Sequence, residues 1–176
     1  MTAPVALACR CGQVRGRLDP AGGSHVLCQC RDCAAGAHHI TGVAPSGPAD
    51  IFQTTPDRLT IDAGFDNLAA IRLSPKGLVR WYARCCATPF ANTMPGPGLP
   101  LRRPFRRVVS GDDRAKLGPV ICEANMRGPD GKTRHRGFTR AAMAILRRAA
   151  LSRVLGRERR APFSVPTMRR PAGPRF

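Results

Sequence analysis

A chain of 176 residues, 43% of them hydrophobic, is long enough to bury the core of one domain. No apolar run approaches the roughly 18 residues of a transmembrane helix, and the first residues lack the basic and apolar regions of a secretory signal, so we expect a soluble cytoplasmic protein with no membrane partner. The 18 glycines and 17 prolines favour turns over long helices.

The net charge of +18 is spread unevenly along the chain. Residues 1–100 hold nine Arg/Lys and six Asp/Glu, whereas residues 101–176 hold 20 and five. A basic C-terminal region can attract nucleic acid or another acidic partner. We favour the plainer interpretation of a solvated surface with an arginine bias, since nine aromatic residues are too few for stacking platforms that bind single strands.

Short strands are expected along the first two thirds of the chain. Residues 5–9 and 13–18 flank a turn that ends at Gly12, a pattern typical of a β-hairpin. Residues 25–29, "HVLCQ", predict a third strand.

A cysteine-rich segment, "CRDCAAG", follows at residues 30–36. It predicts either a tight metal-binding knuckle or a single helical turn that ends at Gly36. Residues 41–50 then predict a loop, because glycine, proline and small polar residues dominate them.

A β-meander is expected next. Its strands are predicted at nearly regular spacing, at residues 58–62, 68–74 and 78–84. The Pro/Gly-rich segment 94–104 predicts a linker. Two further strands are expected after it, at residues 106–110 and 119–126.

One strong helix is predicted near residues 138–157, with Thr139 as its N-cap. Its apolar stripe is expected to pack on the sheet or on a partner and consists of Met143, Leu146, Ala150 and Val154. The last residues, 162–176, are expected to be extended or disordered. The sequence therefore predicts a mainly β domain over residues 1–125 and a basic helix and tail over 126–176.

Eight cysteines are the most informative residues in the chain: Cys9, Cys11, Cys28, Cys30, Cys33, Cys85, Cys86 and Cys122. In a reducing compartment, clustered cysteines bind metals more often than they form disulfides. Cys122 lies in an apolar strand pattern and is expected to be a buried thiol without a ligand role.

The outer cysteines predict a structural zinc site. Cys9 and Cys11 are two residues apart on an expected strand, so both side chains face one way. Cys85 and Cys86 follow the expected meander and supply two more thiolates, which would close a tetrahedral site. Adjacent residues of a strand face opposite ways, so both can bind one ion only if the chain bends there.

The middle cysteines predict a different kind of site. Cys28, Cys30 and Cys33 offer three ligands, and three protein ligands with one open position are typical of a catalytic zinc ion. The alternative is a closed site whose fourth ligand is a nearby side chain, chosen from His25, Asp32, His38 and His39.

The ordered motifs "CRCGQVRG", "CQCRDCAAG" and "WYARCCATPF" resemble the glutathione-dependent formaldehyde-activating enzymes, also called the centromere-protein-V-like family. The similarity covers residues 5–93. It implies an Mss4-like fold of zinc-bound antiparallel β-sheets, one structural zinc and one catalytic zinc held by three cysteines. The family's late element is aromatic-C-x-x-C-G-T-P; this chain has Ala83 at the first of those cysteines, Cys86 at the second and Ala87 at the glycine.

The resemblance also implies carbon–sulfur lyase chemistry on a thiol–aldehyde adduct such as S-hydroxymethylglutathione. Cys28, Cys30 and Cys33 would then hold the catalytic zinc. Arg31, which is next to them in the sequence, could attract a glutathione carboxylate, and the alternative is an ordinary surface arginine. The rival hypothesis is a non-catalytic, zinc-stabilised module whose basic C-terminal region binds an acidic partner or nucleic acid. Such binding would weaken steeply with salt.

Overall fold

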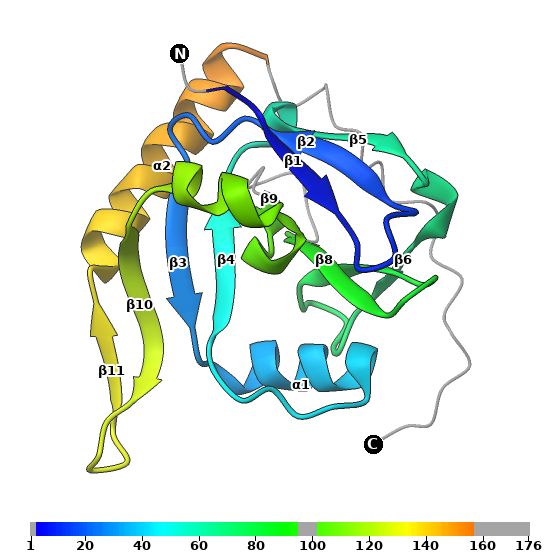
Figure 1. Cartoon of the computed structure of the whole chain (residues 1–176). Coiled ribbons are helices and arrows are strands. Elements are labelled where there is room, and N and C mark those ends of the chain that lie inside the picture. The colour runs from blue at the N-terminus through cyan, green and yellow to red at the C-terminus, as the bar shows by residue number, and fades with distance from the viewer. Residues whose placement is uncertain (1–2, 95–101, 157–176) are drawn as a thin grey trace.

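The computed structural model describes residues 3–94 and 102–156, and this part of the chain is built from three β-sheets and two α-helices (Figure 1). The predicted mainly β fold with a C-terminal helix is confirmed. The expected tail at 162–176 and most of the expected linker at 94–104 lie outside the described residues.

The first sheet contains the predicted hairpin. It has the order β1 (Val5–Ala8), β2 (Arg15–Leu18) and β5 (Leu59–Ala63), with antiparallel pairing throughout. Val5 lies opposite Leu18, and both side chains are buried. The alternation of apolar and polar residues therefore gives this sheet one face towards the core.

The second sheet joins segments that lie far apart in the sequence. Its order is β11 (Thr133–Arg136), β10 (Val120–Arg127), β3 (Ser24–Cys28) and β4 (Ala49–Gln53). The predicted strands at 25–29 and 119–126 correspond to β3 and β10, whose pairing is parallel while the two other pairings are antiparallel. No local pattern predicted β4 or β11.

The third sheet pairs consecutive strands antiparallel. Its order is β6 (Leu68–Ile71), β7 (Val79–Ala83), β8 (Thr88–Thr93) and β9 (Arg102–Pro104). The expected three-stranded meander is therefore wrong in one respect, because β5 pairs with β2 in the first sheet instead of with β6. A 3₁₀ turn, η2 (Phe65–Asn67), preceded by Gly64 at φ 74°, separates β5 from β6.

Short 3₁₀ helices replace one predicted strand. Residues 106–110 do not form a strand: η3 (Arg106–Val108) begins there, and Val109 makes only an isolated bridge to Leu7. The apolar pair Val108 and Val109 that suggested a strand is buried in the core. Two further 3₁₀ helices are η1 (Pro56–Arg58) and η4 (Gly111–Leu117).

The first α-helix is longer than the sequence predicted. Helix α1 (Arg31–Thr41) continues past Gly36 and ends at Gly42, which has φ 73° and donates its N–H to the His38 carbonyl at 2.8 Å. The expected loop at 41–50 is shortened at both ends, because α1 includes Thr41 and β4 begins at Ala49.

Helix α2 (Phe138–Val154) packs on β10 with the face opposite to the predicted one (Figure 1). Its buried side chains are small, namely Ala141, Ala149 and Ser152. The predicted stripe faces solvent instead, and its members Met143 and Val154 are 65% and 83% exposed. Small residues let the helix axis approach the sheet closely. The N-cap is Gly137 and not Thr139, which is the second residue of the helix.

Two hydrophobic clusters form the core. The larger joins the first and third sheets and includes Val5, Leu7, Leu18, Phe52, Leu59, Trp81 and Phe90. The smaller lies between the second sheet and α2 and includes Val26, Ile51, Phe105, Cys122 and Ala141. Cys122 is 3% exposed, as expected for a buried thiol.

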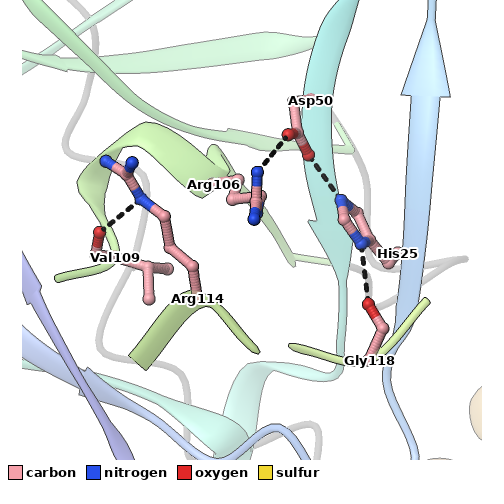
Figure 2. Close-up of polar contacts among 6 residues, drawn as sticks. All are labelled: His25, Asp50, Arg106, Val109, Arg114 and Gly118. Atoms are coloured by element: carbon pink, nitrogen blue, oxygen red, sulfur yellow. Dashed lines mark hydrogen bonds and ion pairs between the residues drawn. The ribbon is translucent and has the colours of Figure 1, made fainter. Parts of the chain in front are cut away.

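A polar network around the buried side chain of His25 ties β3 to its neighbours (Figure 2). His25 Nε2 lies 2.6 Å from Asp50 Oδ1, His25 Nδ1 lies 3.0 Å from the Gly118 carbonyl oxygen, and Arg106 Nη1 reaches Asp50 Oδ2 at 3.5 Å. The network fixes β3, β4, η3 and the segment before β10 relative to one another.

Within the described ranges, neither helix has the length and apolar character needed to cross a membrane.

Candidate metal centres

Four cysteine sulfurs converge between the first and third sheets. Cys9, Cys11, Cys85 and Cys86 lie with all Sγ atoms within 4.8 Å of one another. The pairs Cys9–Cys11, Cys11–Cys85 and Cys9–Cys85 are separated by 3.5, 3.3 and 3.9 Å between their Sγ atoms. The structure thus brings together the four residues that the sequence assigned to one site, and their thiols could hold a metal ion.

The first two sulfurs are presented by the tight turn that joins β1 to β2. The Gly12 N–H donates to the Cys9 carbonyl at 3.0 Å, and Gly12 has φ 76°, a left-handed conformation that favours glycine. The Val14 N–H donates to Cys9 Sγ at 3.3 Å. This hydrogen bond orients the Cys9 sulfur towards the cluster, and Cys9 is buried while Cys11 is exposed.

The other two sulfurs come from a turn between β7 and β8, which supplies the bend that the sequence required. Residues 84–87 form this turn, closed by a hydrogen bond from the Cys86 N–H to the Ala83 carbonyl at 3.3 Å. Ala87 has φ 51°, a conformation unusual for a residue with a side chain. Because the strand is interrupted here, adjacent residues no longer face opposite ways, and Cys85 and Cys86 both reach the cluster.

The pKa values of Cys85 and Cys86 in this cluster are shifted in opposite directions. Burial and a hydrogen bond with Cys11 raise the pKa of Cys85 to about 12. Burial acts to raise the pKa of Cys86 too, but hydrogen bonds from Thr88 and Cys11 outweigh it and lower that pKa to about 6. Binding a dication would therefore release protons from this cluster.

The middle cysteines form a second cluster where β3 ends and α1 begins. Cys28 is the last residue of β3, Cys30 is the N-cap of α1, and Cys33 lies in its first turn, with the three Sγ atoms within 4.8 Å of one another. Cys30 Sγ accepts the Cys33 N–H at 3.3 Å. The Cys30 sulfur thus caps the helix on which Cys33 lies.

A cavity of about 250 Å³ opens beside this three-cysteine cluster. Its walls include the three cysteines, the loop 45–48 and three arginines: Arg31, Arg107 and Arg127. No acidic residue lines it within the part of the chain that the structure describes. Arg31 therefore lies in a basic pocket whose three arginines come from three separate segments of the chain.

The three thiols interact strongly with one another. Hydrogen bonds from Cys30, Cys33 and Asn125 lower the pKa of Cys28, while the hydrogen bond with Cys28 raises the pKa of Cys30 and of Cys33. Negative charge therefore concentrates on Cys28 in the absence of a metal. Three thiols that compete for one negative charge are suited to bind a dication in place of protons.

None of the four candidate fourth ligands joins this cluster. Among the described residues, the cluster of possible ligand atoms contains the three cysteines alone. His25 is held by Asp50 and Gly118, and Asp32 pairs with Arg80. His38 and His39 are exposed on the last turn of α1.

Sequence reasoning missed Asn125 and Arg103 as neighbours of the three-cysteine cluster. Asn125 lies in a bulge of β10 with φ 55°, and its Nδ2 donates to Cys28 Sγ at 3.6 Å. Burial lowers the pKa of Arg103, and the negative charge of Cys33 and Cys28 acts against that shift. No local signal could have found either residue, because both come from strands that are distant from the cysteines in the sequence.

Helix α1 is anchored to the third sheet by a buried arginine. Arg80 on β7 is 3% exposed and pairs with Asp32 in the first turn of α1. Its guanidinium passes over Gly36, where an added Cβ would lie 2.6 Å from Cδ and Nε of Arg80. This close approach explains why a glycine stands in the middle of α1 without ending it.

Gly36→Ala should therefore destabilise the protein by about 2 kcal/mol, since the methyl group displaces Arg80 in a packed site. The sign is informative, because Gly to Ala in an exposed helix interior would stabilise by roughly 1 kcal/mol. Chemical denaturation of both proteins measures the difference. A neutral or stabilising effect would contradict the anchoring contact.

Comparison with known proteins identifies a family but no activity. No curated protein matches this chain. A Rhodobacter sphaeroides protein, solved as a crystal structure by a structural genomics programme, is 18% identical, with a TM-score of 0.47 over 65% of this chain and 96% of that chain. The sequence model of the family of unknown function DUF6151 matches residues 1–168. The chain therefore belongs to the family of unknown function DUF6151.

Proposed function

We propose that the four-cysteine cluster holds a structural zinc ion. Zn–S bonds of about 2.3 Å in a tetrahedron place neighbouring sulfurs about 3.8 Å apart. The sulfur pairs of Cys9, Cys11 and Cys85 measure 3.3 to 3.9 Å, which is close to that spacing. A closed site of this kind would supply folding free energy by linking β1 to the turn after β7.

The three-cysteine cluster is proposed to hold a second zinc ion with one exchangeable position. The observation that carries this proposal is the convergence of Cys28, Cys30 and Cys33 on the wall of a cavity, with no fourth ligand among the described residues. Three protein ligands and access for a small molecule are the features of a catalytic zinc site.

The function we favour is a carbon–sulfur lyase acting on a thiol–aldehyde adduct such as S-hydroxymethylglutathione. In the cleavage direction, the adduct loses its hydroxyl proton, the carbonyl of the aldehyde forms, and the C–S electron pair stays on sulfur as a thiolate. The reverse reaction makes the adduct from thiol and aldehyde. A zinc ion bound at the cluster would supply Lewis acidity that stabilises the developing negative charge.

The residues around the cluster would orient such an adduct. Arg31 and Arg127 line the cavity and can attract the carboxylates of a glutathione-like thiol. The Asn125 amide donates to Cys28 Sγ and would hold that ligand in place. The resemblance of the three cysteine motifs to formaldehyde-activating enzymes suggested this chemistry, and the basic cavity is compatible with an anionic thiol.

The purified protein should contain two equivalents of zinc, of which mild chelation removes one. It should catalyse formation or cleavage of the glutathione–formaldehyde adduct, measured as the change in free thiol or by NMR of the adduct. Chelation should abolish the rate, and added zinc should restore it. Full zinc content without any acceleration over the uncatalysed reaction would contradict the lyase proposal.

The second candidate is a non-catalytic binding module, and the surface of the C-terminal region favours it. All four residues of β11 are exposed, including Arg134 and Arg136, and α2 turns its apolar stripe to solvent. An acidic partner or nucleic acid could bind there. Such binding would weaken steeply as salt rises and would persist in Cys30→Ser, whereas lyase activity would not.

A further inference from the structure

A larger cavity, of about 440 Å³, shares Pro89 and Arg107 with the cavity beside the three-cysteine cluster. Three arginines line it: Arg10 from the turn after β1, and Arg107 and Arg114 from the segment 106–114. Among the described residues, none that lines this cavity is acidic. Guanidinium groups that share a concave surface repel one another, and an anion bound between them would relieve that repulsion.

Each of these arginines is held by a neutral partner. Arg10 Nη2 donates to the Cys86 carbonyl at 3.0 Å, and the Arg107 guanidinium carbon lies 5.9 Å from the ring centre of Phe105. Arg114 Nε donates to the Val109 carbonyl at 3.2 Å, with its two terminal nitrogens on the far side of the guanidinium (Figure 2). These contacts orient the side chains and leave their charges uncompensated.

No ion pair among the described residues uses any of the three. Asp113 is the residue before Arg114 in the sequence, but its carboxylate accepts hydrogen bonds from Lys116 Nζ and the Ala6 N–H instead. Arg114 is half-buried. Partial burial of a guanidinium without a carboxylate costs free energy, which a bound anion would recover.

A metal at the neighbouring four-cysteine cluster would not remove this excess charge. Four thiolates around a dication carry a net charge of about −2, and Arg10 at the edge of that cluster would offset part of it. Arg107 and Arg114 both come from the segment 106–114, and neither forms an ion pair with a carboxylate among the described residues.

We propose that this cavity binds the oxyanion group, phosphate or carboxylate, of a small molecule, with Arg107 and Arg114 as its principal ligands. Both groups present paired oxygens that match the forked donors of arginine. The cavity volume lies within the range of small-molecule sites. The proposal goes beyond the lyase function, since it requires neither the three-cysteine cluster nor catalysis.

The test is isothermal titration of the metal-loaded full chain with inorganic phosphate and, separately, with citrate, at about 150 mM salt so that diffuse attraction is screened. The stronger of the two probes identifies the source of the oxyanion. Arg114→Gln should weaken binding about tenfold or more, as expected for the loss of a charge-assisted hydrogen bond. Arg107→Gln, a change of an exposed side chain, should do the same if Arg114→Gln fails to fold.

Arg15→Gln is the matched control. Arg15 is an exposed residue of β2 that lines neither cavity, and its replacement removes the same charge. Its affinity for both probes should stay within about twofold of the unchanged protein. The proposal is overturned if neither probe binds at millimolar concentration, or if Arg15→Gln weakens binding as much as the cavity variants, because the attraction would then be that of the overall positive charge.

Discussion

Cys9→Ser is expected to reduce the free energy of unfolding by at least about 3 kcal/mol and to lower the melting temperature by roughly 10 °C. Cys9 is 4% exposed, and its sulfur lies within reach of Cys11 and of Cys85, 76 residues away in the chain. Serine is a poor zinc ligand, so the proposed link between β1 and the turn at 84–87 would be lost. Thermal melts with zinc analysis of the same samples measure the effect.

Cys11→Ser separates metal loss from packing loss. Cys11 is exposed, so its sulfur contributes little to the core, yet it lies 3.3 Å from Cys85 Sγ. If a structural zinc ion is present, Cys11→Ser should destabilise the protein nearly as much as Cys9→Ser and lose the same equivalent of zinc. A large effect of Cys9→Ser together with a negligible effect of Cys11→Ser would attribute the loss to packing and refute the structural site.

Cys30→Ser should abolish the proposed lyase activity, lower the proposed zinc content by one equivalent and leave the melting temperature within a few degrees of the original. The cluster lies within one local segment, from the end of β3 to the first turn of α1, so its metal links no distant parts of the chain. The replacement also preserves the helix cap, because serine accepts the N–H that Cys30 Sγ now accepts from Cys33.

Cys30→Ala provides the comparison for the cap. It removes both the metal ligand and the cap acceptor, so it should lose the same zinc and activity and an additional ~1 kcal/mol of stability. Unfolding of Cys30→Ser as severe as that of Cys9→Ser would instead mean that the three-cysteine cluster is structural. The binding-module candidate would then be the better account of the protein.

Local patterns in the sequence predicted the features that depend on neighbouring residues. The hairpin of β1 and β2, the strands β3 and β10, and the existence of α2 follow from alternation, turn residues and helix formers within short windows. The two cysteine groups were also readable, since C-x-C and C-x-x-C spacings place sulfurs together on one turn of chain. The sequence also indicated that the chain must bend at Cys85 and Cys86 for both to bind one ion, but it did not indicate the kind of turn that makes the bend.

Tertiary structure alone decided which elements meet. β5 pairs with β2 in one sheet and β10 pairs parallel with β3 in another, and neither choice is encoded within the strand concerned. Helix α2 buries its small residues and exposes its apolar stripe, because close approach to β10 outweighed the area of the larger side chains. Gly36 sits inside α1 only because Arg80 needs the space.

The two cavities are also features that only the tertiary structure decided. Arg10, Arg107 and Arg114 come from segments about 100 residues apart, and Asn125 meets Cys28 through a bulge in a paired strand. Side chains that act together across such distances leave no periodic signal in the sequence. The cysteine spacing therefore determined the ligand sets of the candidate metal sites, whereas the basic surroundings that would select a ligand arise only when the three sheets pack together.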